Sequence, residues 1–252
     1  MPFSDYKTAL VTGASSGIGA AVVERLSREG IEVHALARNE TALRELAKNT
    51  GCKIHPADVA DTAAITKIAQ KIPFDVLVNN AGVDRPKNFL NADAEDIDLL
   101  VDVNLRAVLH LCRLIVPGMV ARNRGHVVNI SSIAGAYNFG GNSTYHATKA
   151  AVSMLSKQLR VDAFGKRVRV TEICPGRVAT DIFAHVHGDT AETRAKFLDG
   201  FELPQASDIA DAIAFAIAVP VSMNIGHMEI TPTLQVPGGL STAKPQSLVQ
   251  KQ

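Results

Sequence analysis

The sequence predicts an α/β fold: a doubly wound parallel sheet of about seven strands with helices on both faces. Short apolar runs alternate with segments of helical length along the chain, which is the pattern of repeated strand–helix–strand units. The runs are continuously apolar, as expected for strands that bury both of their sides between two helical layers. The expected strands are Thr8–Val11, Ile31–Ala37, Lys53–Pro56, Val76–Val78, His126–Ile130, Val168–Ile173 and His227–Ile230.

The 252 residues leave room for one large domain or two small ones. No linker rich in Pro, Gly or Ser interrupts the alternation, and no repeat or low-complexity tract occurs before residue 238. We therefore expect a single domain over residues 1–240. Residues 241–252 are expected to form a tail that is mobile or packs on a partner subunit.

Charge and composition exclude several classes of partner. The 26 Lys and Arg against 25 Asp and Glu give a net charge of +1, without the basic surface that binds nucleic acid or an anionic membrane. The chain starts with no apolar leader, and its longest apolar run, 212–221, is too short to cross a bilayer. Cys52, Cys112 and Cys174 lack disulfide or metal-site spacing, so we expect buried thiols and no bound metal. A cytoplasmic protein acting on a small molecule is the expectation.

The first expected strand runs into a glycine-rich turn that precedes a helix. Its glycines permit a tight turn and a close backbone approach, while the free N–H groups at the helix start attract a pyrophosphate. We therefore expect the turn to bind a dinucleotide; a plain strand–helix corner is the alternative. The residues of the turn assigned to cofactor binding are Gly13, Ser15, Ser16, Gly17, Ile18 and Gly19.

The end of the second expected strand distinguishes two cofactors. Dinucleotide sites place a carboxylate there to hold the ribose of NAD, and a basic residue to hold the 2′-phosphate of NADP. Here Arg38 ends the strand, and Ala37 before it carries no carboxylate. Because an arginine binds a phosphate through charge-assisted hydrogen bonds, we expect NADP(H) rather than NAD(H). Two alternatives stay open: Glu40 could reach the ribose and permit NAD, or Arg38 could be solvated.

Three further segments follow expected strands or lie on an expected helix. They are Asn79–Gly82 (Asn-Asn-Ala-Gly), Ser131–Ser132, and Tyr145 with Lys149. In this order, and with the glycine-rich turn, they resemble the short-chain dehydrogenase/reductase family over nearly the whole chain. The segments 117–126 and 220–235 are similar to the branch of that family that contains NADP-dependent 3-hydroxy acid and serine dehydrogenases.

This resemblance implies a Rossmann-like fold, a bound dinucleotide and a homotetramer. Beyond the turn and Arg38, the cofactor-binding residues that it implies are Asp58, Val59, Asn80, Ala81, Gly82, Tyr145, Lys149, Pro175, Gly176, Val178 and Thr180. The implied catalytic residues are Asn104, Ser132, Tyr145 and Lys149. By the same resemblance, Lys149 also binds the nicotinamide ribose, and Asn104 supports a chain of waters that relays protons to Lys149.

Elementary chemistry gives a reason for the catalytic roles. Tyr145 and Lys149 are four residues apart on an expected helix and so share a face. An ammonium near a phenol favours the phenolate, as does the positive ring of an oxidised nicotinamide, so we expect the pKa of Tyr145 to lie below about 10. Tyr145 can then exchange a proton with a carbonyl or alcohol oxygen that Ser132 holds.

In a doubly wound sheet, a substrate binds at the loops beyond the carboxyl ends of the strands. The expected substrate residues are Ser132, Ala134, Asn142, Tyr145 and Arg177. Arg177 could clamp a carboxylate; an arginine in solvent or at a cofactor phosphate is the alternative. The segment 180–201 carries alternating charges and few large apolar residues, which favours a closing lid.

We therefore expect an oxidoreductase that transfers a hydride between NADP(H) and a small polar alcohol or carbonyl, such as a 3-hydroxy acid. Two alternatives remain open. A reductase of bulkier ketones or 3-oxoacyl thioesters could share the motifs, and a non-catalytic cofactor-binding regulator could share the fold. The presence of Tyr145 and Lys149 favours an enzyme over the regulator.

Overall fold

The described part of the chain forms one seven-stranded sheet with all strands parallel. The computed structural model describes residues 3, 5–180 and 182–245, without the side chains of 183, 185 and 187. In the order β3-β2-β1-β4-β5-β6-β7, the direction of winding reverses between β1 and β4, which confirms the doubly wound fold. The strands are β1 (Thr8–Thr12), β2 (Glu32–Ala37), β3 (Lys53–Pro56), β4 (Val76–Asn79), β5 (Gly125–Ile130), β6 (Val168–Pro175) and β7 (His227–Ile230).

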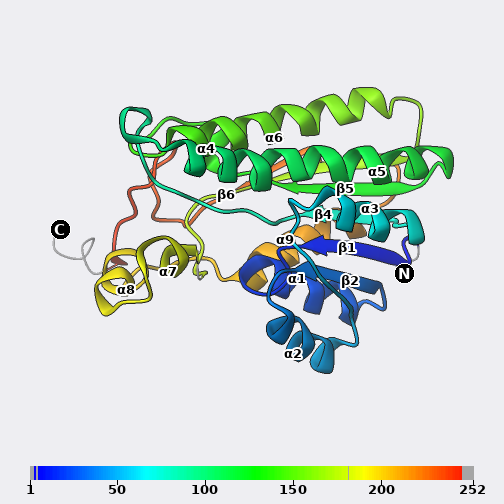
Figure 1. Ribbon diagram of the computed structural model, residues 1–252, viewed down its shortest axis with the longest axis horizontal. Helices are drawn as coiled ribbons and strands as arrows, with labels where there is room; N and C mark the ends of the chain where they lie inside the picture. The colour runs from blue at the N-terminus through cyan, green and yellow to red at the C-terminus, as the bar shows by residue number, and fades with distance from the viewer. Residues whose placement is uncertain (1–2, 4, 181, 246–252) are drawn as a thin grey trace.

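Helices cover both faces of this sheet. In Figure 1, α4, α5 and α6 lie on one side and α1, α2 and α9 on the other, while α7 and α8 lie beyond the carboxyl ends of the strands. The helices are α1 (Gly17–Arg28), α2 (Glu40–Thr50), α3 (Thr62–Lys71), α4 (Ala94–Val101), α5 (Ala107–Ala121), α6 (Ser143–Asp162), α7 (Ile182–His187), α8 (Ala191–Phe197) and α9 (Ala206–Ala218).

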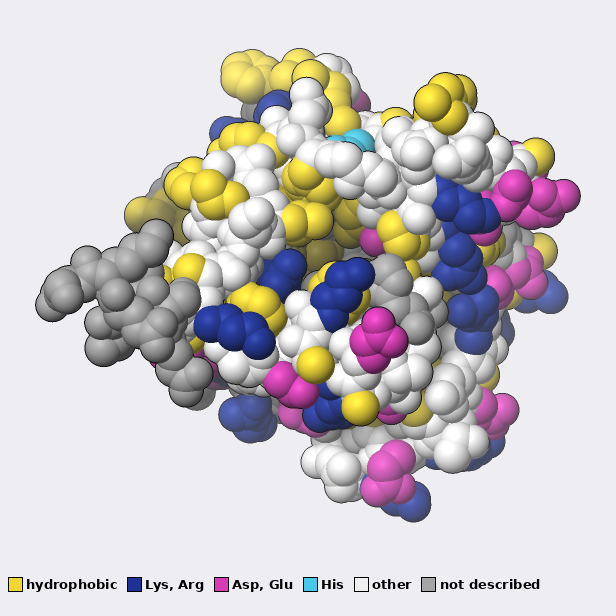
Figure 2. Space-filling model, turned by 90° about the vertical axis from the view of Figure 1, so that its left-hand side faces the viewer, with side chains coloured by type: hydrophobic (Ala, Val, Ile, Leu, Met, Phe, Trp, Pro, Cys, Tyr) yellow, Lys and Arg dark blue, Asp and Glu magenta, His cyan; other side chains and the backbone are white. Residues whose placement is uncertain are grey.

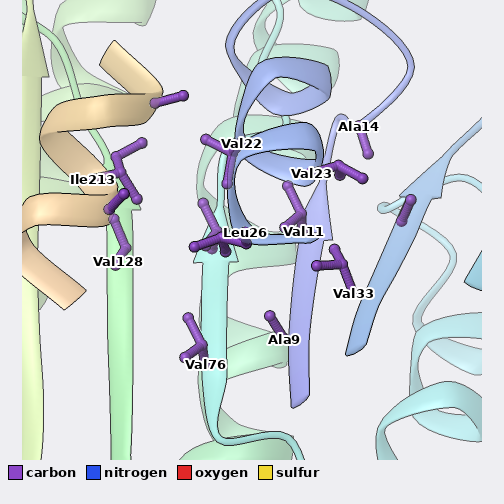
Figure 3. Close-up of a cluster of buried hydrophobic side chains, with 14 of the residues drawn as sticks. Ala9, Val11, Ala14, Val22, Val23, Leu26, Val33, Val76, Val128 and Ile213 are labelled. Atoms are coloured by element: carbon purple, nitrogen blue, oxygen red, sulfur yellow. The ribbon is translucent and has the colours of Figure 1, made fainter. Parts of the chain in front are cut away.

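The two faces of the sheet bury separate sets of apolar side chains. In β1, Ala9 and Val11 pack with the layer of α1 and α9, whereas Leu10 packs with the layer of α3, α5 and α6. Leu26 of α1 and Ile213 of α9 are fully buried over the first face (Figure 3). Each such side chain contributes about 1.5–3 kcal/mol through its burial. The loops at the carboxyl edge therefore extend from a sheet that is packed on both faces.

The first residues of the expected tail contact the rest of the chain. An antiparallel bridge joins Gln235 and Thr242. The Lys244 ammonium donates to the backbone carbonyl of Asp199 at 2.8 Å. Residues 246–252 of the tail lie outside the described residues. None of the described helices has both the length and the apolar character needed to cross a membrane.

Candidate active site

Loops that follow six of the strands surround a cavity at the carboxyl edge of the sheet. Its volume is about 890 Å³, and Figure 2, which looks at this edge, shows a hollow near the centre of the molecule. Parallel strands bring these loops together because they all end at the same edge. The sequence-predicted residues that line the cavity are Gly13, Ser15, Ser16, Gly17, Ile18, Arg38, Asp58, Val59, Asn80, Ala81, Gly82, Ser132, Tyr145, Lys149, Pro175, Gly176, Val178 and Thr180.

Glycines let the turn between β1 and α1 pack closely on the chain around it. Gly13 has a φ of +64°, and a Cβ on it would lie 2.8 Å from the Ala81 Cα. Gly19 does not line the cavity; a Cβ there would lie 2.2 Å from the Gly13 carbonyl oxygen, so this glycine lets α1 pack on the turn. Helix α1 has no capping side chain and no acidic residue in its first turn, which suits an anion at its N–H groups. These residues fit the pyrophosphate of a dinucleotide.

A buried threonine ties this turn to the loop after β4. The Thr12 hydroxyl accepts hydrogen bonds from the backbone N–H groups of Asn80 and Ala81, both at 3.0 Å. The Asn80 side chain donates in return to the Thr12 carbonyl oxygen at 2.9 Å. Sequence reasoning assigned Thr12 no role in the site, although its place directly before the glycine-rich turn was a signal.

Arg38, the residue expected to bind a 2′-phosphate, lies at the cavity. It lines the cavity, its side chain is 69% exposed, and its guanidinium lies 3.8 Å from the Asp58 carboxylate. Asn39 fixes the start of α2, because its side chain caps the first turn of that helix. The Glu40 side chain binds Arg44 on the next turn of α2 and does not line the cavity. The geometry favours a phosphate at Arg38 over a ribose at Glu40.

Helix α6 carries the reactive pair to the cavity. Lys149 Nζ donates to the Ile130 carbonyl at 2.9 Å and lies 5.5 Å from the centre of the Tyr145 ring. The Ser132 hydroxyl accepts from the backbone N–H of Ala134 at 3.2 Å, and its side chain also hydrogen-bonds to Tyr145. The structure therefore brings Ser132, Tyr145 and Lys149 together.

The protonation of this pair differs from the expectation. Burial raises the pKa of Tyr145 well above its usual value, the Asp84 carboxylate raises it further, and the hydrogen bond from Ser132 offsets only part of the rise. Burial lowers the pKa of Lys149 to about 8. This direction is opposite to the expected lowering of the Tyr145 pKa, because a half-buried phenolate loses part of its hydration and faces the negative charge of Asp84. A tyrosine that stays protonated at neutral pH is suited to donate its proton to a carbonyl oxygen.

Asn104 lies on a π-helical turn, Asp102–Arg106, between α4 and α5. Its side chain accepts from the Val83 N–H at 2.8 Å and donates to the Val83 carbonyl oxygen at 2.9 Å. Such turns are frequent at functional sites. The buried Asn104 therefore positions the loop after β4, next to Gly82; its part in a proton relay stays a prediction.

Three of the expected substrate residues do not line the cavity. The Arg177 guanidinium lies 5.1 Å from the centre of the Phe201 ring. Ala134 is buried, and the Asn142 amide binds the Asp84 carboxylate. Sequence reasoning placed these residues in loops near the site, but contacts with distant parts of the chain decide where their side chains point.

Further residues line the cavity beyond those predicted to bind the cofactor or to act in catalysis. Asp84 and Arg85 come shortly after the Asn-Ala-Gly motif, and this position was a signal for both. Ile182 and Val186 of α7 add apolar surface from the segment expected to act as a lid. These further lining residues are Leu36, Ala37, Asn39, Ala57, Val83, Asp84, Arg85, Val103, Ile130, Ser131, Ile182 and Val186.

The parallel sheet, the glycine-rich turn and the Ser–Tyr–Lys cluster define an α/β oxidoreductase that binds a dinucleotide. The model of the short chain dehydrogenase family matches residues 7–191, and the chain belongs to this family. The family predicted from the motifs is therefore confirmed.

Similar proteins cover nearly the whole chain. An uncharacterised short-chain type dehydrogenase/reductase of Sinorhizobium fredii is 39% identical, over 96% of this chain and 98% of its own length. The NADP-dependent 3-hydroxy acid dehydrogenase of Escherichia coli is 35% identical, over 92% of this chain and 97% of its own. The closed form of a serine dehydrogenase complexed with NADP+ matches with a TM-score of 0.87 at 33% identity, over 94% of this chain and 99% of that one.

Proposed function

We propose that the protein is an NADP(H)-dependent oxidoreductase that interconverts a small polar alcohol and its carbonyl, with 3-hydroxy acids as the leading substrate class. The observation that carries the proposal is the meeting of Ser132, Tyr145 and Lys149 in the cavity that also holds the glycine-rich turn and Arg38. The Escherichia coli relative is named for NADP and a 3-hydroxy acid, and the serine dehydrogenase structure is a complex with NADP+. Both support the cofactor and the substrate class.

In the reductive direction, Ser132 holds the carbonyl oxygen and Tyr145 gives it a proton. The bound cofactor supplies the hydride. The raised pKa of Tyr145 keeps its proton in place until negative charge develops on the oxygen of the substrate. Lys149, with a pKa of about 8, supplies a positive charge near the Tyr145 ring when it is protonated.

Replacing Tyr145 with Phe tests the proton-donor role. The wild type is expected to reduce NADP+ with small 3-hydroxy acids. In the variant, kcat should fall about 10²- to 10⁴-fold. NADPH binding, followed by cofactor fluorescence, should be unchanged, because the aromatic ring is kept and only its hydroxyl is removed. Turnover retained in Tyr145→Phe would refute the role.

The same assays distinguish the alternatives. Turnover of bulky ketones or 3-oxoacyl thioesters, without turnover of small hydroxy acids, would favour a reductase of those larger substrates. Tight NADPH binding by the wild type without turnover of any alcohol or carbonyl would favour a regulator.

We also propose that the chain forms a homotetramer in the cytoplasm. Exposed apolar side chains on α5 and α6, among them Leu109, Met154 and Val161, support contact with further copies. The three cysteines are buried and free, which suits a reducing compartment.

A further inference from the structure

Three side chains that can bind a metal meet on one face of the sheet, where β6 pairs with β7. Cys174 of β6 lies opposite Glu229 of β7 in the register, and His227 lies two residues before Glu229, on the same face of its strand. One ligand atom from each of the three side chains lies within 4.8 Å of the other two. None of the three lines the cofactor cavity. The cluster is therefore separate from the proposed active site.

The chemistry of the cluster suits zinc. A thiol, an imidazole and a carboxylate are the three kinds of protein ligand that zinc takes, whereas calcium and magnesium take oxygen ligands. The thiolate and the carboxylate together balance the charge of a divalent ion. Ligand atoms of a tetrahedral zinc lie about 2.0–2.3 Å from the metal and hence about 3–4 Å from one another. His227 and Glu229 are exposed and can rotate to close the remaining gap, while the buried Cys174 fixes the position of the site.

A buried carboxylate behind His227 provides the outer contact that zinc ligands usually have. Glu172 lies 3.1 Å from His227 Nδ1. The same carboxylate accepts hydrogen bonds from the hydroxyls of Ser131 at 2.5 Å and Ser153 at 3.2 Å. A histidine that binds zinc commonly donates its other ring N–H to such a group, which fixes its tautomer and orientation. Because Glu172 engages Nδ1, His227 can bind the metal through Nε2.

The present contacts of the other two ligands are compatible with a metal. The side chain of Tyr137 hydrogen-bonds to the Glu229 carboxylate, which has a second oxygen for a metal. Burial raises the pKa of the Cys174 thiol to about 11, and a hydrogen bond with Ser131 offsets only part of this rise. The thiol is therefore protonated at neutral pH in the absence of a metal. A zinc ion that binds Cys174 displaces this proton into solvent.

We propose that Cys174, His227 and Glu229 bind one zinc ion, with a water as the fourth ligand. The ion joins β6 to the edge strand β7 directly before Pro175 and Gly176, which line the cofactor cavity. Because only the folded chain brings the two strands together, zinc stabilises the fold. The spacing of the cysteines predicts no metal, since the other two ligands belong to a neighbouring strand and not to a local motif.

Calorimetry with Zn²⁺ tests the site on the full chain, without an affinity tag and after dialysis against a chelator. The wild type should bind one Zn²⁺ per chain, and its unfolding temperature should rise with Zn²⁺. Cys174→Ser and His227→Gln should each weaken binding at least about tenfold. His227 is exposed, so its variant keeps the test decisive if Cys174→Ser does not fold. Cys52→Ser is the control, because it removes a buried thiol outside the cluster and should leave binding unchanged.

Co²⁺ in place of Zn²⁺ shows directly whether the thiolate binds. The wild type and Cys52→Ser should give the near-ultraviolet absorption of a cobalt–thiolate bond, and Cys174→Ser should lack it. Glu172→Gln should keep this absorption but weaken Zn²⁺ binding about 10- to 100-fold, since it alters only the outer contact of His227.

Three results would overturn the proposal. They are a wild type that binds no Zn²⁺, Zn²⁺ binding that is the same in Cys174→Ser and His227→Gln as in the wild type, and a wild-type Co²⁺ complex without the thiolate absorption. None of these measurements needs turnover, so their failure would leave the proposed oxidoreductase function unaffected.

Discussion

Burial sets the protonation of the reactive side chains. Lys149 is 5% exposed, and its ammonium lies against the Ile130 carbonyl, so it has lost most of its hydration. Its pKa falls to about 8, while the pKa of Tyr145 rises. Both shifts favour the uncharged form, because burial costs a charged group more free energy than a neutral one. The site thus pairs a neutral phenol with a lysine that changes charge near neutral pH.

The Lys149→Met variant tests, through the free energy of unfolding, how much the burial of the Lys149 ammonium opposes folding. A lysine whose pKa is lower in the folded state opposes folding below a pH of about 8, and this penalty fades as the pH rises toward the ordinary value of 10.5. Relative to the variant, the wild type should gain about 1.4 kcal/mol of unfolding free energy per pH unit between those values. Urea unfolding of both proteins across this range measures the difference. A difference that stays constant with pH would contradict the assignment.

Arg38→Asp should change the cofactor preference. The loss of the guanidinium removes charge-assisted hydrogen bonds to a 2′-phosphate, and the new carboxylate can bind a ribose hydroxyl. The affinity for NADPH should fall about tenfold or more, while that for NADH is kept or rises. Arg44→Asp is the matched control, since Arg44 pairs with Glu40 and does not line the cavity. Titrations with NADPH and NADH measure the preference of each variant. An unchanged preference in Arg38→Asp would contradict the binding of the 2′-phosphate by Arg38.

Motifs located most residues of the site, but not the direction of every side chain. Ser132 and Lys149 line the cavity as expected, because a motif defines both the place on an element and the local backbone. Arg177 belongs to the expected loop, yet its guanidinium packs on Phe201, which no local pattern indicates. Asp84 comes shortly after the Asn-Ala-Gly motif, but its contact with Asn142, at the start of α6, depends on the fold and on no local pattern.

Apolar patterns predicted which strands and helices occur more accurately than they predicted the residues at which these elements begin and end. The expected strands Lys53–Pro56 and His227–Ile230 agree with β3 and β7. The sixth strand continues to Pro175 because its backbone pairs with Ile230, a contact that hydrophobicity does not reveal. The π-helical turn Asp102–Arg106 was not predicted, since helical periodicity does not resolve an extra residue.

Gly19→Ala should weaken cofactor binding by forcing α1 away from the turn. A Cβ there would lie 2.2 Å from the Gly13 carbonyl oxygen, which is backbone and cannot rotate aside. The free energy of unfolding should fall by about 1–3 kcal/mol, and NADPH affinity should fall with it. Gly140→Ala is the control, because a Cβ there meets no atom within 4 Å. If thermal melting and NADPH titration show the two variants to be alike, the close packing of α1 on the turn is not required.

At the scale of the whole molecule, a near-zero net charge conceals charged side chains of both signs around the cavity. Arg38 follows β2 and Asp84 follows β4, at the same edge of the sheet. Of these two residues, Arg38 carries the charge that suits a phosphate. Composition predicted a protein that acts on small molecules, but a net charge of +1 carries no information about position.

The outer surface of α5 and α6 predicts how copies of the chain assemble. Met154 and Val161 lie on one face of α6 and are 62% and 65% exposed, and Leu109 on the neighbouring α5 is 45% exposed. Packing these helices against the same pair in another copy would remove this apolar surface from water. Val161→Lys should therefore convert the proposed homotetramer into smaller species, as measured by sedimentation velocity. Lys48→Glu, on α2 across the sheet, should leave the proposed homotetramer intact. A Val161→Lys protein that sediments like the wild type would show that α6 does not form the interface.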